Sequence, residues 1–512
     1  PTTPEPSDTV IVAISDLFAE TYLPTRTPCG EEIAYVPEYE FLTMAEIGTT
    51  KLKPGLAEKW ESAADGSSWT FYLREGVPWH DDWGEFTAED VKYSIERIME
   101  EDSVNAFQGR FQKYIDSVEI VDTYTVIIHL TEPRVLFPYD LWDIDPYVPI
   151  FSKNYVETVG DDEASRHPIG TGPYKFLEHR TGEYVKHEAL DEHWRIVPDF
   201  KYLIVKTVPE LSTRVAMLRR GEIDVTDLST ELKSELEGYG FKVLRNKDAQ
   251  LTKLSFFGQY IPELRKGYDP TVPWVDGDDP ERALKVRKAM AMAIDRQGIV
   301  DHMFQGMGRV LDYPLDFKPG DPWTDPSWEP IPYDPEGAKR LLAEAGYPDG
   351  FSFVHWLVPD TGLPELTDIQ TAVAMEWEKI GLFVTLGTAD WAVWKPKMMD
   401  RAIAGTTAVT ACGSNFEPLI WVEKLQTSYG PYCFGYESYR LDDLVAEALT
   451  KTDYDERGKV QMKIGEIFHN EYRQIPMLAL DTIFAVSDKI ESWTLSPIAG
   501  CFMGYENIIK AK

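Results

Sequence analysis

The sequence is poor in features that define whole classes of protein. No stretch approaches the ~18 uninterrupted apolar residues that a membrane-spanning helix requires. Four cysteines, Cys29, Cys412, Cys433 and Cys501, are too few for a disulfide scaffold and show no CxxC spacing. Two interpretations stay open for them: the disulfides Cys412–Cys433 and Cys29–Cys501, or four buried thiols.

Basic residues are scarce relative to acidic ones. Lys and Arg number 51 against 86 Asp and Glu, which gives a formal net charge of −35. Nucleic-acid phosphates and anionic membrane surfaces both attract basic faces, so this balance excludes both as partners. The acidic residues are spread along the chain, and pairs such as Asp278-Asp279 predict solvated turns rather than a site.

Motifs for nucleotide, hydrolase and metal chemistry are also missing. The chain contains no GxxxxGK[ST] loop and no GxSxG elbow. Gly170-Thr-Gly172 is followed by Pro173, which indicates a turn and not a dinucleotide loop. His187 and His193 stand six residues apart, so they cannot share one helical face as zinc ligands, and we expect surface histidines here. We expect no catalytic residue, no metal and no cofactor.

What is present indicates a large globular α/β protein. The 512 residues are 43% hydrophobic and 27% charged, which suits about three domains' worth of soluble sequence. Helical and strand patterns alternate throughout, as in mixed α/β folds. The patterns predict strands at 8–15 and 124–130, a helix at 87–99, a helix pair at 281–303 and a helix at 334–346. The Pro-rich start, residues 1–7, predicts a tether left after a signal segment was removed, although a trimmed sequence would look the same.

Several motifs resemble one family of proteins. They are Leu56–Glu61 (LAEKWE), Trp69–His80 (WTFYLREGVPWH), Phe86–Val91 (FTAEDV), Gly170–Phe176 (GTGPYKF), Val286–Arg296 (VRKAMAMAIDR), Tyr333–Tyr347 (YDPEGAKRLLAEAGY) and Gln474–Leu478 (QIPML). Together and in this order, they resemble the signature of the family 5 bacterial solute-binding proteins, the oligopeptide-, dipeptide- and nickel-binding group. Because the motifs run along nearly the whole chain, the resemblance is specific.

The resemblance implies a two-lobed periplasmic-binding-protein fold of type II, in the large cluster with an extra subdomain, whose lobes are joined by two crossover strands. Lobe I would comprise 8–50, 165–257 and 480–512, the subdomain 51–164, and lobe II 258–479. It further implies an extracytoplasmic monomer that takes a small solute between the lobes and gives it to the permease of an ABC importer. Contact with a membrane would be limited to a lipid anchor.

The resemblance also places ligand-binding residues. The family's anchor for a peptide ammonium group is an Asp three residues before an acidic-Pro pair, here Glu417-Pro418, so the corresponding residue is Ser414. Serine carries no charge to neutralise an ammonium group, which puts peptide specificity in doubt. Trp391 matches the place where the family's cleft presents an aromatic residue. The other candidate contacts are Cys412, Gly413, Asn415, Trp394, Trp421, Phe18, Glu20, Phe257 and Tyr260.

Three functions remain open at this stage. A peptide or peptide-like ligand follows from the family, whereas Ser414 and the tryptophans favour a neutral oligosaccharide that stacks on aromatic faces. Most single tryptophans are nevertheless expected to fill the core. A secreted glycoside hydrolase or peptidase is the alternative of another class, and turnover of a labelled substrate would reveal it. A sensor could replace the permease as partner.

Overall fold

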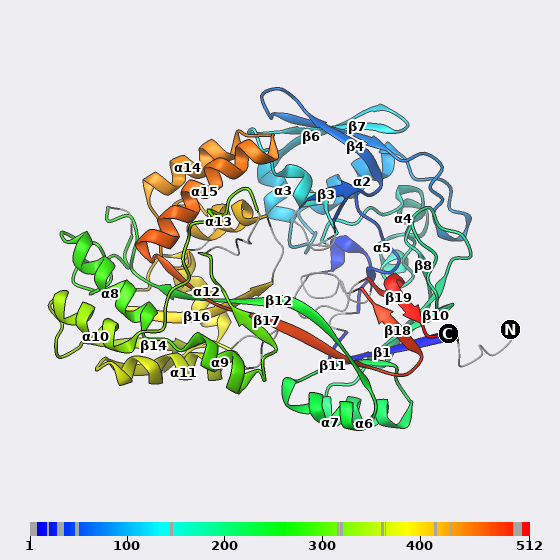
Figure 1. The fold of residues 1–512 in the computed structure, drawn as a ribbon. Helices are drawn as coiled ribbons and strands as arrows, with labels where there is room; N and C mark the ends of the chain where they lie inside the picture. The colour runs from blue at the N-terminus through cyan, green and yellow to red at the C-terminus, as the bar shows by residue number, and fades with distance from the viewer. Residues whose placement is uncertain are drawn as a thin grey trace. The chain divides into compact units, whose positions relative to one another are not determined.

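The chain folds into two compact units, and the predicted α/β class is confirmed (Figure 1). The computed structural model describes residues 8–17, 20–27, 35–46, 51–143, 147–263, 265–314, 317, 321–359, 363, 365–413, 417–430, 433–494 and 504–512. Unit 1 comprises Pro1–Asn246 with Ile483–Lys512, and unit 2 comprises Lys247–Thr482. The chain passes between the units inside two strands, β12 (Lys242–Phe256) and β17 (Gln474–Val486).

The main sheet of unit 1 is built around β1 (Thr9–Ile14), which confirms the strand predicted at 8–15. β1 is parallel to β10 (Tyr202–Thr207) and to β11 (Val225–Leu228). β9 (Tyr184–Ala189) and β8 (Tyr174–Arg180) continue the sheet in antiparallel order, and the last residues of β17 pair with β11. The β-branched residues of β1 favour this position because they pack well on a pleated surface that is buried.

A second sheet of unit 1 is antiparallel, in the order β4 (Ala57–Ser62), β5 (Ser68–Leu73), β7 (Thr125–Leu130) and β6 (Ile115–Asp122). Helix α2 (Ala88–Met99) packs on it and begins after Thr87, whose backbone N–H donates to the Asp90 carboxylate at 2.9 Å. Val91, Ile95 and Ile98 are fully buried, so the predicted helix and its apolar face are confirmed.

Short elements complete unit 1. They are β2 (Thr43–Ala45), β3 (Leu52–Pro54), α3 (Gln108–Tyr114), α4 (Lys153–Val159), α5 (Asp161–Ala164), α6 (Leu211–Arg220), α7 (Lys233–Gly238), β18 (Ile490–Trp493) and β19 (Ile508–Lys510). The turn at Gly170–Gly172 packs on the backbone of residues 37–38. A Cβ atom on Gly170 would lie 1.8 Å from the carbonyl oxygen of Glu38, so the close approach requires glycine and the predicted turn is confirmed.

The sheet of unit 2 has the order β15 (Phe383–Thr388), β14 (Ser352–Leu357), β16 (Thr406–Gly413) and β12. β14 is parallel to both of its neighbours, whereas β16 and β12 are antiparallel. Short strand β13 (Gly308–Val310) pairs with β17. Because β16 runs back along β12, its last residue, Gly413, lies opposite Gln250, which is near the point where β12 enters unit 2.

Helices cover this sheet. They are α8 (Pro280–Met292), α9 (Arg296–Met303), α10 (Pro335–Glu344), α11 (Leu366–Lys379), α12 (Trp391–Met399), α13 (Pro418–Gln426), α14 (Tyr439–Leu449) and α15 (Tyr454–Glu471). α8 packs against α10, and α14 lies beside α15 (Figure 1). The predicted helix pair and the Asp334-capped helix are confirmed: the Asp334 carboxylate accepts from the N–H of Gly337 at 2.7 Å, and Pro335 occupies the first turn.

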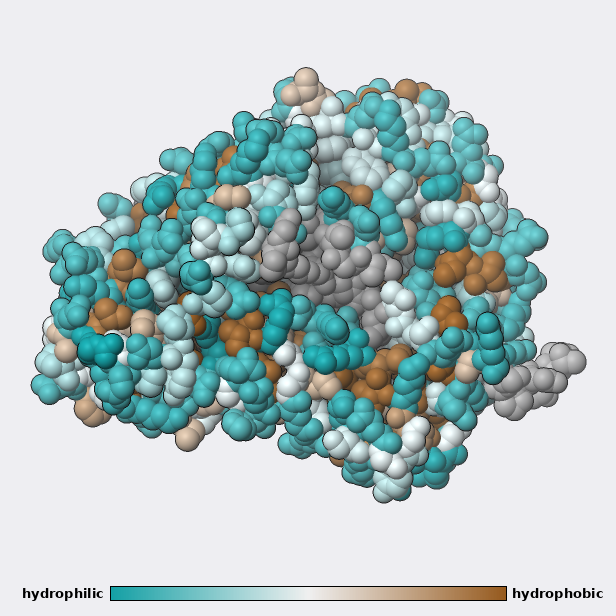
Figure 2. Space-filling model, viewed as in Figure 1, coloured by the Kyte–Doolittle hydropathy of each residue, from teal (hydrophilic) through white to brown (hydrophobic). Residues whose placement is uncertain are grey.

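The visible surface is predominantly polar. Figure 2 shows hydrophilic residues over most of this face, with hydrophobic residues in small separate groups. Within the described part of the chain, no helix combines the length and the apolar character needed to cross a membrane.

Candidate functional site

The loop after β16 carries the centre of the predicted ligand site. Ser414 and Asn415 lie outside the described residues. For Cys412 and Gly413 the structure gives the strand position, opposite Leu251 and Gln250 of β12, while their side chains are outside the description. The last residue of β16, Gly413, therefore lies opposite a residue in the middle of β12, three positions after Lys247, where unit 2 begins.

The predicted aromatic contacts divide into one exposed residue and a buried group. Trp391 is the first residue of α12 and is 40% exposed. Trp394, one turn later, is 1% exposed and packs edge-on against Phe257 with ring centres 5.4 Å apart. Both belong to a core cluster in which Trp394 also contacts Trp356, at 5.1 Å. Trp391 is thus accessible to a ligand, whereas Trp394 and Phe257 fill the core beneath α12.

Trp421 on α13 is partly buried against the same cluster. Two lysines approach its ring: the ammonium of Lys253 lies 5.6 Å from the ring centre and that of Lys424 lies 5.3 Å away. Cations at this range are attracted by the indole face. Lys253 is a buried residue of β12 opposite Thr410, so this group lies on the same strand pair as the predicted ligand loop.

In unit 1, Phe18 lies outside the described residues, and Glu20 is held by its neighbours. The Glu20 carboxylate accepts from the backbone N–H of Gly182 at 2.9 and 3.0 Å and is in contact with the ring of His179. Its backbone has a positive φ of 53°, which is uncommon for a residue other than glycine. The carboxylate of this candidate contact is therefore already engaged within unit 1.

Tyr260, the last predicted contact, forms part of a pocket of about 320 Å³ in unit 2. We call it the tyrosine pocket; it is lined by residues 259–263, 275–277 and 436–439 with Tyr268 and Arg473. Tyr260 itself is only 4% exposed. The pocket begins three residues beyond the last residue of β12, whereas Gln250, opposite Gly413, lies six residues before that last residue.

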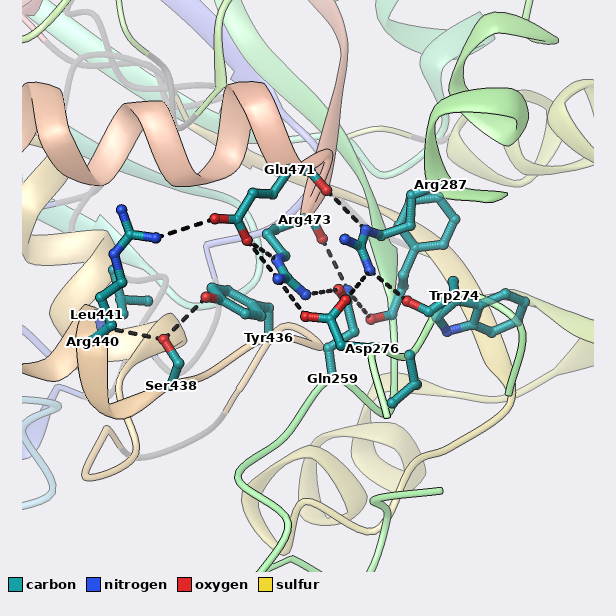
Figure 3. A network of polar contacts seen from close by, with 12 residues as sticks. Gln259, Trp274, Asp276, Arg287, Tyr436, Ser438, Arg440, Leu441, Glu471 and Arg473 are labelled. Atoms are coloured by element: carbon teal, nitrogen blue, oxygen red, sulfur yellow. Dashed lines mark hydrogen bonds and ion pairs between the residues drawn. The ribbon is translucent and has the colours of Figure 1, made fainter. Parts of the chain in front are cut away.

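A network of charges forms the floor of the tyrosine pocket (Figure 3). Arg473 lies between Asp276, which it contacts at 2.6 Å, and Glu471, and its Nη1 donates to the side-chain oxygen of Gln259 at 3.3 Å. Arg287 donates to the other carboxylate oxygen of Asp276 at 2.9 Å. Burial alone would raise the pKa of Asp276, but Arg473 and Arg287 outweigh burial and lower it. Asp276 is therefore a paired carboxylate.

A second carboxylate of the pocket is equally committed. Glu437 is fully buried, and Arg265 donates to one of its oxygens at 2.6 Å and Arg401 to the other at 3.2 Å. The guanidinium of Arg473 also lies over the ring of Tyr436, 4.7 Å from its centre. Sequence reasoning missed this network because its members are far apart in the chain. The one local signal was that Arg473 immediately precedes the motif Gln474–Leu478.

The prediction of surface histidines was wrong, and of the two interpretations left open for Cys433 the structure shows the buried thiol. His187 and His193 are not surface residues: their side chains are 0% and 3% exposed. Alternation in β9 turns His187 inward with Val185 and Ala189, where its Nδ1 lies 2.6 Å from the buried Glu38 carboxylate. Cys433 is a free, buried thiol that donates to the carbonyl of Tyr436, so it forms no disulfide with Cys412.

Two further points concern the remaining cysteines and metals. Cys29 and Cys501 lie outside the described residues. Within the described part of the chain, no group of three or more His, Cys, Asp or Glu side chains is arranged to hold a metal ion.

Comparison with known proteins places this architecture in a family. Residues 51–416 match the model of the bacterial extracellular solute-binding proteins, family 5. Heme-binding protein A of Haemophilus influenzae is 28% identical over 492 residues, which cover 90% of this chain and 84% of that protein. The dipeptide-binding protein of Escherichia coli is 26% identical over 495 residues, with 90% and 87% covered. The solved structure of HbpA2 from Haemophilus parasuis has a TM-score of 0.83 at 25% identity and covers 98% of this chain and 100% of that one.

The family match begins just before β3 in unit 1 and extends three residues beyond the end of β16 in unit 2. The matched range therefore includes residues of both units and the whole of β12. The chain belongs to the bacterial extracellular solute-binding proteins of family 5.

Proposed function

We propose that the protein is the extracytoplasmic substrate-binding component of an ABC importer. It captures a peptide or peptide-like solute by closure of its two units and presents the loaded form to the permease. The observation that carries this proposal is the family match over 51–416, together with relatives that cover 90% of the chain and are named for the solutes they bind. Removal of the solute from water between two units provides tight binding without chemistry.

The proposal includes binding without turnover. The named relatives are binding proteins, which supports this choice over a secreted glycoside hydrolase or peptidase. Incubation of the protein with labelled peptides or oligosaccharides should return them unchanged. Release of a cleaved product by purified protein, but not by buffer, would contradict it.

Two other solutes compete with a peptide. Heme is the ligand in the name of the Haemophilus influenzae relative, and it is flat and apolar enough to suit an aromatic site. An oligosaccharide would suit Ser414, because a neutral ligand needs no buried carboxylate at that position. The peptide proposal therefore requires that a group other than Ser414 receives the peptide's ammonium group.

Native mass spectrometry of the freshly purified protein, followed by denaturation and identification of released molecules, tests the solute class. A released peptide supports the proposal, and a released sugar or heme redirects it to that class. Calorimetric titration with the identified solute then tests Trp391→Ala, for which we expect an affinity loss of at least about tenfold. The unfolding free energy should stay within about 0.5 kcal/mol, because Trp391 is 40% exposed.

Phe383→Ala is the matched control, since Phe383 is an exposed aromatic residue of unit 2, 61% accessible, on β15. It should leave solute affinity unchanged. An equal loss of affinity in both variants, or none in either, would remove Trp391 from the site.

A further inference from the structure

The tyrosine pocket contains one predicted solute contact, Tyr260, and lies away from Gly413, the last described residue of β16. Gln250, in the middle of β12, lies opposite Gly413, whereas the pocket begins at Gln259, beyond the end of the strand at Phe256. From Gln250 to Phe256 the strand alone extends about 20 Å. The pocket therefore lies well away from Gly413, the last residue of β16.

Aromatic rings supply most of the pocket's large side chains: Tyr260, Tyr268, Tyr436 and Tyr439. Tyr439 is 56% exposed and Tyr268 is half-buried, so both present ring surface to an incoming molecule. The ring of Tyr436 already carries a cation, because the guanidinium of Arg473 lies 4.7 Å from its centre. Electron-rich faces of this kind favour positively charged groups over neutral ones of the same shape.

Four arginines around the pocket already take part in ion pairs. Arg473 and Arg287 bind Asp276, and Arg265 and Arg401 bind Glu437. Arg473 also donates to Glu471 and Gln259, which leaves its guanidinium few hydrogens for an anionic ligand. An anion would therefore have to break an existing ion pair to bind here.

The acidic groups at the mouth are not all matched. Glu263 lines the pocket and is exposed, and Asp278 is exposed in the neighbouring turn; neither has an ion pair within the described residues. Tyr268 reports on the resulting field: burial raises the pKa of its phenol, and Asp278, Asp276 and Glu263 raise it further. Two carboxylates without an ion pair among the described residues, Glu263 and Asp278, therefore act on Tyr268.

We propose that the tyrosine pocket is a second binding site that takes an organic cation, an alkylguanidinium or alkylammonium group, between the rings of Tyr268 and Tyr439 and the carboxylate of Glu263. The volume of about 320 Å³ equals the space of about ten waters, which suits a small molecule and not a folded domain. The cation is a free small molecule, and its binding does not depend on the solute that the two units capture.

Calorimetric titration of the full chain with butylguanidinium chloride tests the site, with neutral butylurea as the probe of nearly the same shape. Butylguanidinium should bind saturably and butylurea should not. Glu263→Gln and Tyr268→Ala should each weaken butylguanidinium by about two- to fivefold, the size of an exposed cation–π or ionic contact. Asp349→Asn is the control: Asp349 is exposed in unit 2, is not part of the pocket and changes the net charge by the same amount.

Several results would overturn the site: no saturable binding of butylguanidinium, equal binding of butylurea, or affinity that only Asp349→Asn reduces. Glu263 is exposed, so Glu263→Gln keeps the test valid if Tyr268→Ala folds poorly. The solute identified by mass spectrometry should bind the Glu263→Gln variant with unchanged affinity. Loss of solute binding in that variant would show that the pocket and the solute site are one, which also overturns the inference.

Discussion

The two units bury different kinds of charge. The buried charged residues described in unit 1 are mostly acids, Glu38, Glu40, Asp90, Asp140 and Asp224, with Arg134 and Arg214. Those of unit 2 are mostly bases, Arg287, Arg296, Arg401, Arg457, Arg473 and Lys253, with Glu417 and Glu437. A guanidinium stays charged at any ordinary pH, whereas carboxylates and imidazoles gain or lose protons.

The partners of these charges differ as well. In unit 2, Arg401 donates to the carbonyls of Thr427 and Gly430 at 3.2 and 2.7 Å as well as to Glu437, and so joins loops of the backbone. In unit 1, Glu40 accepts from Trp194 at 2.7 Å and from Arg195 at 3.0 Å. Burial raises the pKa of Glu40 to about 7, despite Arg195. Glu40, a buried carboxyl of unit 1, therefore titrates near neutral pH, whereas the buried arginines of unit 2 stay charged.

The largest effect on stability is expected when a buried arginine of unit 2 is replaced. Arg401→Met should lower the unfolding free energy by about 3–5 kcal/mol, because Glu437 would lose one of its two arginines and the carbonyls their donor. Urea denaturation measures the loss. Arg440→Met is the control, because the Arg440 side chain is 67% exposed and its loss should cost under about 1 kcal/mol. Equal losses in the two variants would mean that burial of arginine does not stabilise unit 2.

The second prediction concerns the titrating core of unit 1. The pKa of Glu40 is about 7 in the folded chain against an ordinary 4.5, so the folded state binds this proton more tightly than the unfolded state. Stability contributed by the protonated carboxyl is complete below pH 4.5 and is lost as the pH rises through 7. Between these limits the wild type should lose about 3 kcal/mol relative to Glu40→Gln, which cannot titrate.

Urea denaturation of both proteins from pH 4.5 to pH 8 measures this difference. Glu336→Gln, which alters a carboxyl whose side chain is 72% exposed, serves as the control and should track the wild type. A constant gap between wild type and Glu40→Gln would show that Glu40 stays ionised throughout, held by Arg195.

The smallest expected effect on stability concerns His355. It is a buried residue of unit 2 that can titrate, whereas most buried charged residues of this unit are arginines. This residue is fully buried, and its Nδ1 lies 2.6 Å from the hydroxyl of Thr407. Burial lowers the pKa of His355 to about 3, although contacts with Gln370 and Thr407 oppose the shift. Below pH 6.5, His355 is protonated in the unfolded chain but stays neutral in the folded chain. The free energy of unfolding therefore decreases as the pH falls below 6.5.

The contribution of His355 between pH 6.5 and pH 5 is about 2 kcal/mol. His355→Asn keeps a polar partner for Thr407 and cannot protonate, so its stability should fall less steeply over this range. Urea denaturation at several pH values gives the slope of the unfolding free energy against pH for each protein, and the two slopes are compared. Parallel slopes for variant and wild type would contradict the buried neutral imidazole.

Local patterns in the sequence predicted the elements well. The strand at β1, the capped helix α2 and the Asp334-capped helix α10 were all confirmed, because their signals lie within a few residues of one another. Burial of His187 was not predictable, since its partner Glu38 lies on a distant segment. The same reason hid the tyrosine pocket, which combines the end of β12 with the turn at 275–277, the residues before α14 and Arg473.

The candidate solute site was only partly accessible from the sequence. Trp391 could be singled out from the family pattern, and its side chain is exposed. Trp394, three residues later, carries the same chemistry but fills the core beneath α12. The two tryptophans lie about one turn apart at the start of α12, yet one is 40% exposed and the other 1%, a difference that residue type alone does not indicate.

Unit 1 is discontinuous along the chain, which sets an order for its completion during synthesis. Strand β11 pairs with Ile483–Val486 of β17, and Lys510 donates to Asp8 at 2.6 Å, so the first and last parts of the chain meet. A nascent chain that ends before residue 483 leaves the edge of β11 open to other strands. Unit 2, by contrast, is continuous from Lys247 to Thr482 and can finish first. The N-terminal unit of this protein is therefore the last to close, and C-terminal truncation damages the part of the molecule that is translated earliest.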